Sequence, residues 1–254
     1  MTSSRALIVG LVVLVAIGIG AYIAYDQVLR GDSAPALALP SVAPGTAASN
    51  DAGTSSAPAA PAAPSASAAT LDGDVNGTWT VTTGSQVGYR VREQLANLPA
   101  ESDAVGRTDQ VSGSITVTSD GTTTTVTDGA LTVDTTSITS DRSQRDGRMR
   151  SQGLQTDQFP TATFTLTQPV DVPATAVQGT PADITLVGDL TLHGVTKSVS
   201  IPAKAQLVGG QIQVAGSVDI ALADFAIVAP NVGGFIISIA DQGALDFVLV
   251  LDKG

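Results

Sequence analysis

Residues 187–201 read VGDLTLHGVTKSVSI, and their pattern predicts two β-strands joined by a tight turn. Alternate positions from Leu186 to Leu192 carry leucine or glycine and therefore share one face of an extended strand. The polar side chains from Asp189 to His193 share the other face. Gly194 follows directly, and glycine adopts the positive φ of a tight reversal without a steric penalty. The stretch therefore predicts a β-hairpin.

Similar short alternating segments fill the chain from Gly77 onward, separated by glycine, aspartate and asparagine. The predicted strands are residues 78–82, 86–93, 109–118, 122–133, 161–167, 184–193, 197–208, 211–222, 235–240 and 244–251. Gly209 and Gly210 supply a two-residue hairpin turn, and residues 241–243 separate the last two strands. So many strands joined by short turns predict an all-β barrel or sandwich.

Two of these strands indicate which faces are buried. Residues 211–222 carry apolar side chains on alternate positions, which predicts one inward face made of Ile212, Val214, Val218, Ile220 and Leu222. The last strand contains FVLVL at residues 247–251 and is apolar on both faces. We therefore expect both faces of this strand to be covered.

One segment, residues 140–154 (SDRSQRDGRMRSQGL), does not alternate and predicts a short helix inserted among the strands. Ser140 suits the N-cap, and Asp141 suits the first turn. Asp141 and Arg145 are four residues apart in the favourable acid-first order, although such a pair contributes only about 0.3–0.5 kcal/mol. Gly153 is expected to end the helix.

The N-terminal part of the chain differs in composition from the strand-rich part. Residues 6–25 carry no charge, and about 20 apolar helical residues cross a bilayer. We predict a single-pass transmembrane signal anchor over residues 1–30, because the apolar region of a cleaved signal peptide is usually only roughly 7–15 residues long. Arg5 favours a cytoplasmic N-terminus, which places the C-terminal domain outside the cytoplasm. Residues 31–76, rich in Ala, Pro and Ser, predict a disordered linker to a barrel domain over residues 77–254.

Charge and composition exclude several classes of function. The formal net charge is −11, whereas nucleic-acid binding needs a basic surface. The chain has no cysteine, which excludes disulfides and thiolate metal sites. His193 is the only histidine, so we predict neither a metal nor another cofactor. No serine elbow or comparable motif accompanies His193, so the sequence predicts a protein that is not an enzyme.

Several short motifs follow one another in the order of a known family. They are Trp79 with SQVGYRV at 85–91, DTTSITS at 134–140 with RDGRMRS at 145–151, FPTATF at 159–164, GDLTLHGVTK at 188–197 and DFAI at 224–227. Over roughly residues 77–251 the chain resembles the YceI-like family of lipid- and polyisoprenoid-binding proteins. Three features depart from the family pattern. Residues 90–93 stand where the family often carries a histidine, residues 94–107 are longer and more polar, and Ala226 replaces the usual glycine.

The resemblance implies an elongated, lipocalin-like antiparallel β-barrel of about eight strands that holds an amphiphile with a long apolar tail. Burying about ten methylene groups yields roughly 8 kcal/mol at ~0.8 kcal/mol each, whereas association costs about 4–15 kcal/mol. Only a long chain, such as a polyisoprenoid or a fatty lipid, therefore leaves a surplus in an uncharged lumen. We predict a membrane-tethered domain that sequesters or carries such a lipid, and the sequence predicts no oligomeric state.

Ten residues are candidates for ligand binding. They are Trp79, Tyr89, Arg145, Arg148, Phe159, Phe164, Leu190, Leu192, His193 and Phe225. The aromatic residues either pack in the core alone or also line the lipid channel. The arginines either form a solvated helix face or hold a polar or anionic head group at the barrel mouth, because arginine binds phosphate oxygens bidentately. His193 is interpreted as a turn residue, or else as a contact to the head group.

Two alternative functions stay open at this point. The first is a structural or adhesive β-domain on a stalk, with a filled core and no ligand. The second is an enzyme that uses His193 with Asp189 or Asp146. A continuous apolar hollow among the strands is the feature that distinguishes a binding protein from the first alternative.

Overall fold

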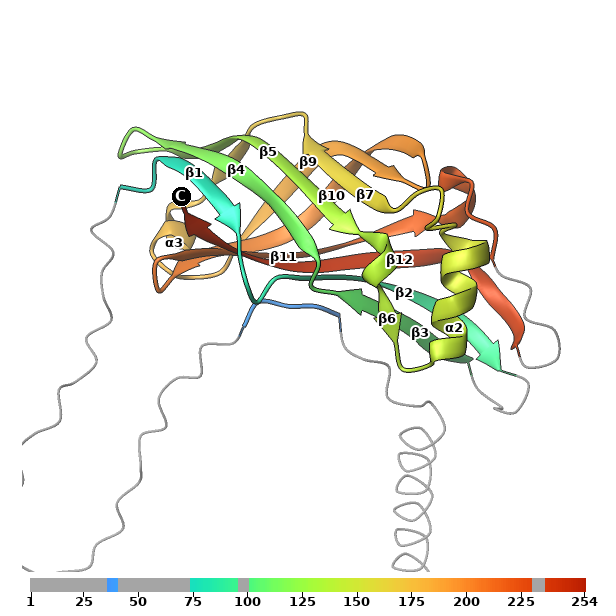
Figure 1. The fold of residues 1–254 in the computed structure, drawn as a ribbon. Coiled ribbons are helices and arrows are strands. Elements are labelled where there is room, and N and C mark those ends of the chain that lie inside the picture. The colour runs from blue at the N-terminus through green and yellow to red at the C-terminus, as the bar shows by residue number, and fades with distance from the viewer. Residues whose placement is uncertain (1–35, 41–73, 96–100, 230–235) are drawn as a thin grey trace, which may run out of the picture.

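The computed structural model describes residues 36–40, 74–95, 101–229 and 236–254 (Figure 1). Its strands are β1 (Gly77–Val81), β2 (Gln86–Leu95), β3 (Glu101–Thr108), β4 (Val111–Ser119), β5 (Thr124–Asp134), β6 (Thr139–Ser140), β7 (Thr161–Leu166), β8 (Val170–Val172), β9 (Ala182–Leu192), β10 (Val195–Val208), β11 (Gln211–Ala221) and β12 (Ile236–Lys253). Its helical segments are the 3₁₀ turns η1 (Thr135–Ser137) and η3 (Leu222–Phe225), the helices α2 (Ser143–Arg148) and α3 (Ala174–Val177), and the π-helical turn η2 (Met149–Gly153).

The strands form one antiparallel sheet that closes on itself. The closed ring runs through β1, β4, β5, β7, β9, β10, β11 and β12, and β12 pairs with β1 where Trp79 lies opposite Lys253. Figure 1 shows an elongated barrel with α3 near one end and α2 at the other. For the described residues, the prediction of an all-β barrel of about eight strands with one short inserted helix is confirmed.

At the end where α2 lies, strands β2, β3 and β6 form a second branch of the sheet that continues from β12. Strand β5 pairs with β7 up to Asp134 and Thr161, and the chain then turns through η1 into β6. Strand β6 pairs with β3, which pairs with β2, which in turn pairs with β12. Helix α2 follows β6 directly in the chain and contacts it. The helix therefore lies at the end of this second branch, beside β6.

The hairpin predicted around Gly194 is present. Leu192 of β9 lies opposite Val195 of β10, and the two residues between them, His193 and Gly194, have φ angles of 52° and 74°. Positive φ at both central positions is the geometry that matches the twist of a two-residue hairpin. The Gly209-Gly210 turn between β10 and β11 is confirmed in the same way.

The last strand differs from the prediction of two strands separated by a turn at residues 241–243. Strand β12 is continuous over 18 residues. Its pairing with β2 shifts in register between Ile239 and Gly243, so the extra residues form a bulge on that side. Pairing with β11 stays regular through Gln242 opposite Ala221, and these bonds keep the chain extended.

The sequence pattern also misses β3, β8 and α3. The inward side of β3 carries the small buried residues Ala104, Gly106 and Thr108, which produce no hydrophobic alternation. The predicted helix is present as α2 and η2, but its predicted cap is wrong. Ser140 lies in β6, where its hydroxyl bonds to Asp146 at 2.6 Å, and the N-cap position is occupied by Arg142 without a side-chain capping bond.

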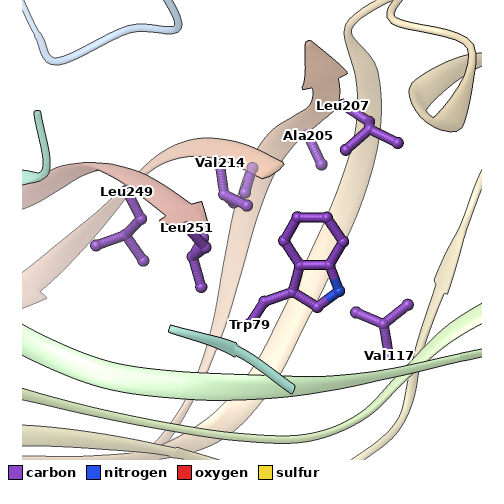
Figure 2. Close-up of a cluster of buried hydrophobic side chains, with 8 residues drawn as sticks. Trp79, Val117, Ala205, Leu207, Val214, Leu249 and Leu251 are labelled. Atoms are coloured by element: carbon purple, nitrogen blue, oxygen red, sulfur yellow. The ribbon is translucent and has the colours of Figure 1, made fainter. Parts of the chain in front are cut away.

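Side chains of the protein itself fill most of the α3 end of the barrel. Trp79 is 3% exposed, and its ring lies among the other members of a buried cluster. Figure 2 shows these neighbours, which are Val117, Ala205, Leu207, Val214, Leu249 and Leu251. The indole N–H donates to the Val75 carbonyl at 3.0 Å, so the polar edge of the ring is satisfied. This end of the barrel is closed.

The predicted transmembrane segment, residues 6–25, lies outside the described residues. Among the residues that the structure does describe, no helix is long and apolar enough to span a membrane. Most of the predicted linker also lies outside them, so the anchor and the linker stay predictions. Residues 36–40 are described, and they contact the barrel at β12.

Candidate functional site

A cavity of about 610 Å³ occupies the α2 half of the barrel. Inward-facing side chains on alternate positions of the strands form its wall, including Leu131, Ile201 and Leu245. Most of the wall is apolar, and this interior space is not filled by the side chains around it. The cavity is the feature that the alternative of a filled β-domain lacks.

Strands β9 and β11, together with Leu222 at the start of η3, present the faces that the sequence predicts. Leu186, Leu190, Leu192, Val218, Ile220 and Leu222 line the cavity. Ile212 and Val214, nearer the other end of β11, belong to the core around Trp79. One continuous apolar face therefore serves the closed end of the barrel and the hollow end.

A layer of side chains separates this cavity from a second one of about 90 Å³. Leu131, Phe164, Leu186 and Leu249 line both. The ring of Phe164 fits because Gly188 on the neighbouring strand has no side chain. A Cβ at Gly188 would lie 2.5 Å from the Cζ atom of Phe164, which is closer than real Cβ contacts. Gly188 thus makes room for Phe164 in the layer of side chains between the two cavities.

Charged side chains line the cavity at the α2 end. The guanidinium of Arg145 pairs with the carboxylate of Glu93 on β2, with 2.5 Å between Nη2 and Oε1, and also contacts Asp141. Arg142 pairs with the same Asp141 at 3.6 Å. The side chain of Glu93 is only 3% exposed, so Arg145 replaces much of the water that this carboxylate would otherwise need. The mouth is polar, and these charges are paired.

Two groups at this end have perturbed proton affinities. Burial raises the pKa of Tyr89 to about 12, and the positive charge of Arg145 opposes this only in part. Burial by itself lowers the pKa of Arg145. The hydrogen bond and the attraction from Glu93, joined by Asp141, outweigh burial and leave the pKa of Arg145 raised. At neutral pH Tyr89 is therefore uncharged and Arg145 is charged.

The predicted candidates separate into two groups. Those that line the cavity are Tyr89, Arg145, Arg148, Phe164, Leu190 and Leu192. Those that do not line it are Trp79, Phe159, His193 and Phe225, because Trp79 fills the closed end and the other three form a cluster under the β9–β10 turn. Sequence reasoning missed Glu93. Its signal is the alternation of Val87, Tyr89, Val91 and Glu93, all of which line the cavity.

His193 holds the turn against a neighbouring segment. Its Nδ1 lies 3.0 Å from the carbonyl of Phe225 and therefore donates a hydrogen bond to it, and its ring packs edge-on against Phe159 at 4.5 Å between centroids. Asp146, one acid of the enzyme alternative, accepts bonds from the N–H and the hydroxyl of Ser140. In the described part of the chain, no group of three or more histidines and acidic residues is arranged to hold a metal.

Comparison with known proteins identifies relatives of the strand-rich region. A model of the YceI-like domain family matches residues 79–251. The protein YceI of Escherichia coli O17:K52:H18 is 40% identical over 75 residues, which are 29% of this chain and 35% of that protein. A UPF0312 protein of Vibrio vulnificus strain YJ016 is 40% identical over 75 residues, or 29% of this chain and 36% of that protein. The match spans about a third of the length of these curated relatives.

Two solved structures share the fold. A polyisoprenoid binding domain from Saccharophagus degradans, implicated in plant cell wall breakdown, superposes with a TM-score of 0.52 at 22% identity, covering 70% of this chain and 99% of that one. BcnA of Burkholderia cenocepacia gives a TM-score of 0.50 at 20% identity, with coverages of 65% and 95%. At these identities the likeness establishes the fold alone. Since the family model matches well over half of the chain, the chain belongs to the YceI family.

Proposed function

We propose that this chain binds a long-chain amphiphile, such as a polyisoprenoid or a fatty lipid, with the tail in the barrel cavity. The observation that carries the proposal is the cavity of about 610 Å³, which has an apolar wall and a polar end at α2. Each methylene group moved from water into such a space contributes about 0.8 kcal/mol, so a long tail gains far more than a small polar molecule. Membership of the family, and the polyisoprenoid binding domain of S. degradans, support the same ligand class.

The head group is proposed to lie at the α2 end, beside Arg145. This arginine is already paired with Glu93 and Asp141, so an anionic head group has to compete with two carboxylates for one guanidinium. A neutral head group, such as a hydroxyl, can accept a hydrogen bond there without displacing Glu93. We therefore favour a neutral polar head over a phosphate.

Tethering to a membrane and sequestration or carriage of the lipid are further parts of the proposal. The uncharged run at residues 6–25 supports a membrane anchor, with the barrel outside the cytoplasm. Binding is favoured over catalysis because the side chains of His193 and Asp146 are engaged in bonds that hold turns and helix α2.

Filling the cavity with a protein side chain tests this function. Ala162 of β7 lines the cavity, whereas the adjacent Thr161 is exposed on the other side of the strand. Ala162→Trp therefore places an indole inside the barrel, and Thr161→Trp places the same group outside. We expect Ala162→Trp to weaken binding of a long-chain prenol at least about tenfold, a loss that equilibrium titration resolves easily. Equal binding by the two variants would contradict the proposal.

A further inference from the structure

A carboxylate is buried on the outer side of the barrel wall. Leu245, Asp246 and Phe247 of β12 all line the cavity. Successive side chains of a strand point to opposite faces, so the carboxylate of Asp246, which bonds to Arg107 and to the N–H of Leu37, lies on the face opposite to Leu245 and Phe247. Its exposure is nevertheless 0%. A buried carboxylate needs hydrogen-bonding or charged partners, because its loss of hydration is otherwise uncompensated.

Three groups converge on the Oδ2 atom of Asp246: Leu37 and Arg107 donate hydrogen bonds to it, and Arg90 forms an ion pair with it. The backbone N–H of Leu37 lies at 2.9 Å, Nη1 of Arg107 at 3.2 Å and Nε of Arg90 at 3.4 Å. Arg107, Gly88 and Asp246 lie opposite one another on β3, β2 and β12. Because Gly88 has no side chain, Arg107 crosses it. A Cβ at Gly88 would lie 3.0 Å from Cγ of Arg107.

Leu37 belongs to residues 36–40, ALALP, which we call the strap. Figure 1 shows the strap in blue on the outside of the barrel. The hydrogen bond from Leu37 to Asp246 joins it to β12. Leu37 and Leu39 are half-buried, whereas Ala36, Ala38 and Pro40 are exposed, so the leucines share the side that faces the protein. Val248 points outward two residues beyond Asp246 and is only 8% exposed. The strap therefore meets β12 at a buried carboxylate, two residues from a buried valine on the same face.

We propose that the outer surface around Asp246, Arg90 and Arg107 is a docking site for the strap, so that the chain binds its own linker. Residues 31–76 contain five leucines and valines, which are Leu37, Leu39, Val42, Leu71 and Val75. The first two belong to the strap. An N–H bond to an ionised carboxylate is stronger than one between neutral groups. Closing the chain between the strap and β1 costs entropy that rises only with the logarithm of the loop length.

Docking changes how far the barrel can move from a membrane. An extended linker over residues 31–76 spans up to roughly 140 Å. With the strap docked, only residues 31–36 separate the proposed anchor from the barrel, and they span about 20 Å at most. The docked strap therefore holds the barrel close to the bilayer. This consequence rests on the proposed anchor, whereas docking itself rests on neither the anchor nor the lipid.

Hydrogen exchange of the full-length chain in detergent micelles tests docking without any ligand. We compare Leu37→Ser/Leu39→Ser, which removes both inward leucines, with Ala36→Ser/Ala38→Ser, which alters only exposed positions of the same strap. In the unchanged chain and in Ala36→Ser/Ala38→Ser, the Leu37 amide should exchange at least about tenfold more slowly than an unstructured amide. In Leu37→Ser/Leu39→Ser, the amide of residue 37 should exchange within about twofold of the unstructured rate, while the amides of β12 stay protected.

A distance measurement provides an independent readout. The chain has no cysteine, so spin labels can be placed at Ala38→Cys on the strap and at Asp219→Cys on β11, both of which are exposed. We expect one narrow distance distribution, which becomes broad when Leu37→Ser/Leu39→Ser is added. The docking proposal is overturned if the Leu37 amide of the unchanged chain is unprotected. It is also overturned if Leu37→Ser/Leu39→Ser changes neither the protection of this amide nor the distance distribution. Either result leaves the lipid proposal unaffected.

Discussion

Replacing Glu93 by glutamine should change which head groups the barrel accepts. The substitution keeps the size of the side chain and an acceptor for Arg145 but removes the negative charge that lies 2.5 Å from Nη2. A hydrogen bond to a charged group contributes about 1.5–3 kcal/mol and is roughly twice as strong as a neutral one. The change therefore leaves about 1–1.5 kcal/mol of the interaction of Arg145 available to an anionic ligand. Since about 1.4 kcal/mol is a factor of ten, we expect Glu93→Gln to bind a prenyl phosphate about tenfold more tightly than the unchanged chain.

The assay is competition between a fluorescent lipid and two unlabelled ligands of equal tail length, a prenol and the corresponding prenyl phosphate. The affinity for the prenol should stay within about twofold, because the tail still occupies the same cavity. Asp141→Asn is the matched control. Asp141 also contacts Arg145, but its side chain is 69% exposed, and solvent screens such a charge. The reasoning about the mouth is refuted if the unchanged chain already prefers the phosphate and Glu93→Gln leaves that preference unaltered.

Three further substitutions test the structure around the cavity. Gly188→Ala should lower the free energy of unfolding by about 1–3 kcal/mol in denaturant titrations, because its Cβ would lie 2.4 Å from the Thr165 carbonyl oxygen and 2.5 Å from the Phe164 ring. Trp79→Ala should cost about 3–5 kcal/mol of unfolding free energy and leave prenol affinity unchanged, because Trp79 fills the closed end. Tyr89→Phe should flatten the loss of stability at alkaline pH. The folded pKa of Tyr89, about 12, lies above the ordinary 10.0, so its contribution is complete below pH 10 and is lost as pH rises from 10 to 12. The two chains should therefore differ by up to roughly 2–3 kcal/mol across this range, and parallel pH profiles would show that Tyr89 is not protected from ionisation.

The strand pattern around Gly194 and Gly209 is readable from the sequence because two local rules agree there. Alternating apolar residues define the strands, and glycine at a positive φ defines each turn. The same rules do not predict strand β3, because the side chains at its inward positions, such as Ala104 and Gly106, are too small to produce a hydrophobic alternation. The bulge in β12 is not predicted either, because Asp241-Gln242-Gly243 has the composition of a turn, whereas in the structure Gln242 and Gly243 pair with β11.

The candidate site is only partly readable for a different reason. Aromatic residues are conspicuous in any sequence, but their positions along the barrel axis depend on the register of the whole sheet. Phe164 therefore lines the cavity, whereas Trp79 fills the closed end. Long-range partners are hidden as well. Glu93 meets Arg145 from 52 residues away, and Leu37 meets Asp246 from 209 residues away.

Mass spectrometry of the purified full-length protein tests the central claim most directly. The chain is purified in a short-chain detergent, measured intact under native conditions and then extracted for lipid analysis. If the cavity is a lipid site, the intact mass includes one long-chain amphiphile, and the extract of Ala162→Trp contains much less of it than the extract of Thr161→Trp. A protein that is repeatedly empty, and that takes up no long-chain prenol or fatty lipid when these are added, contradicts the claim that this barrel holds a lipid.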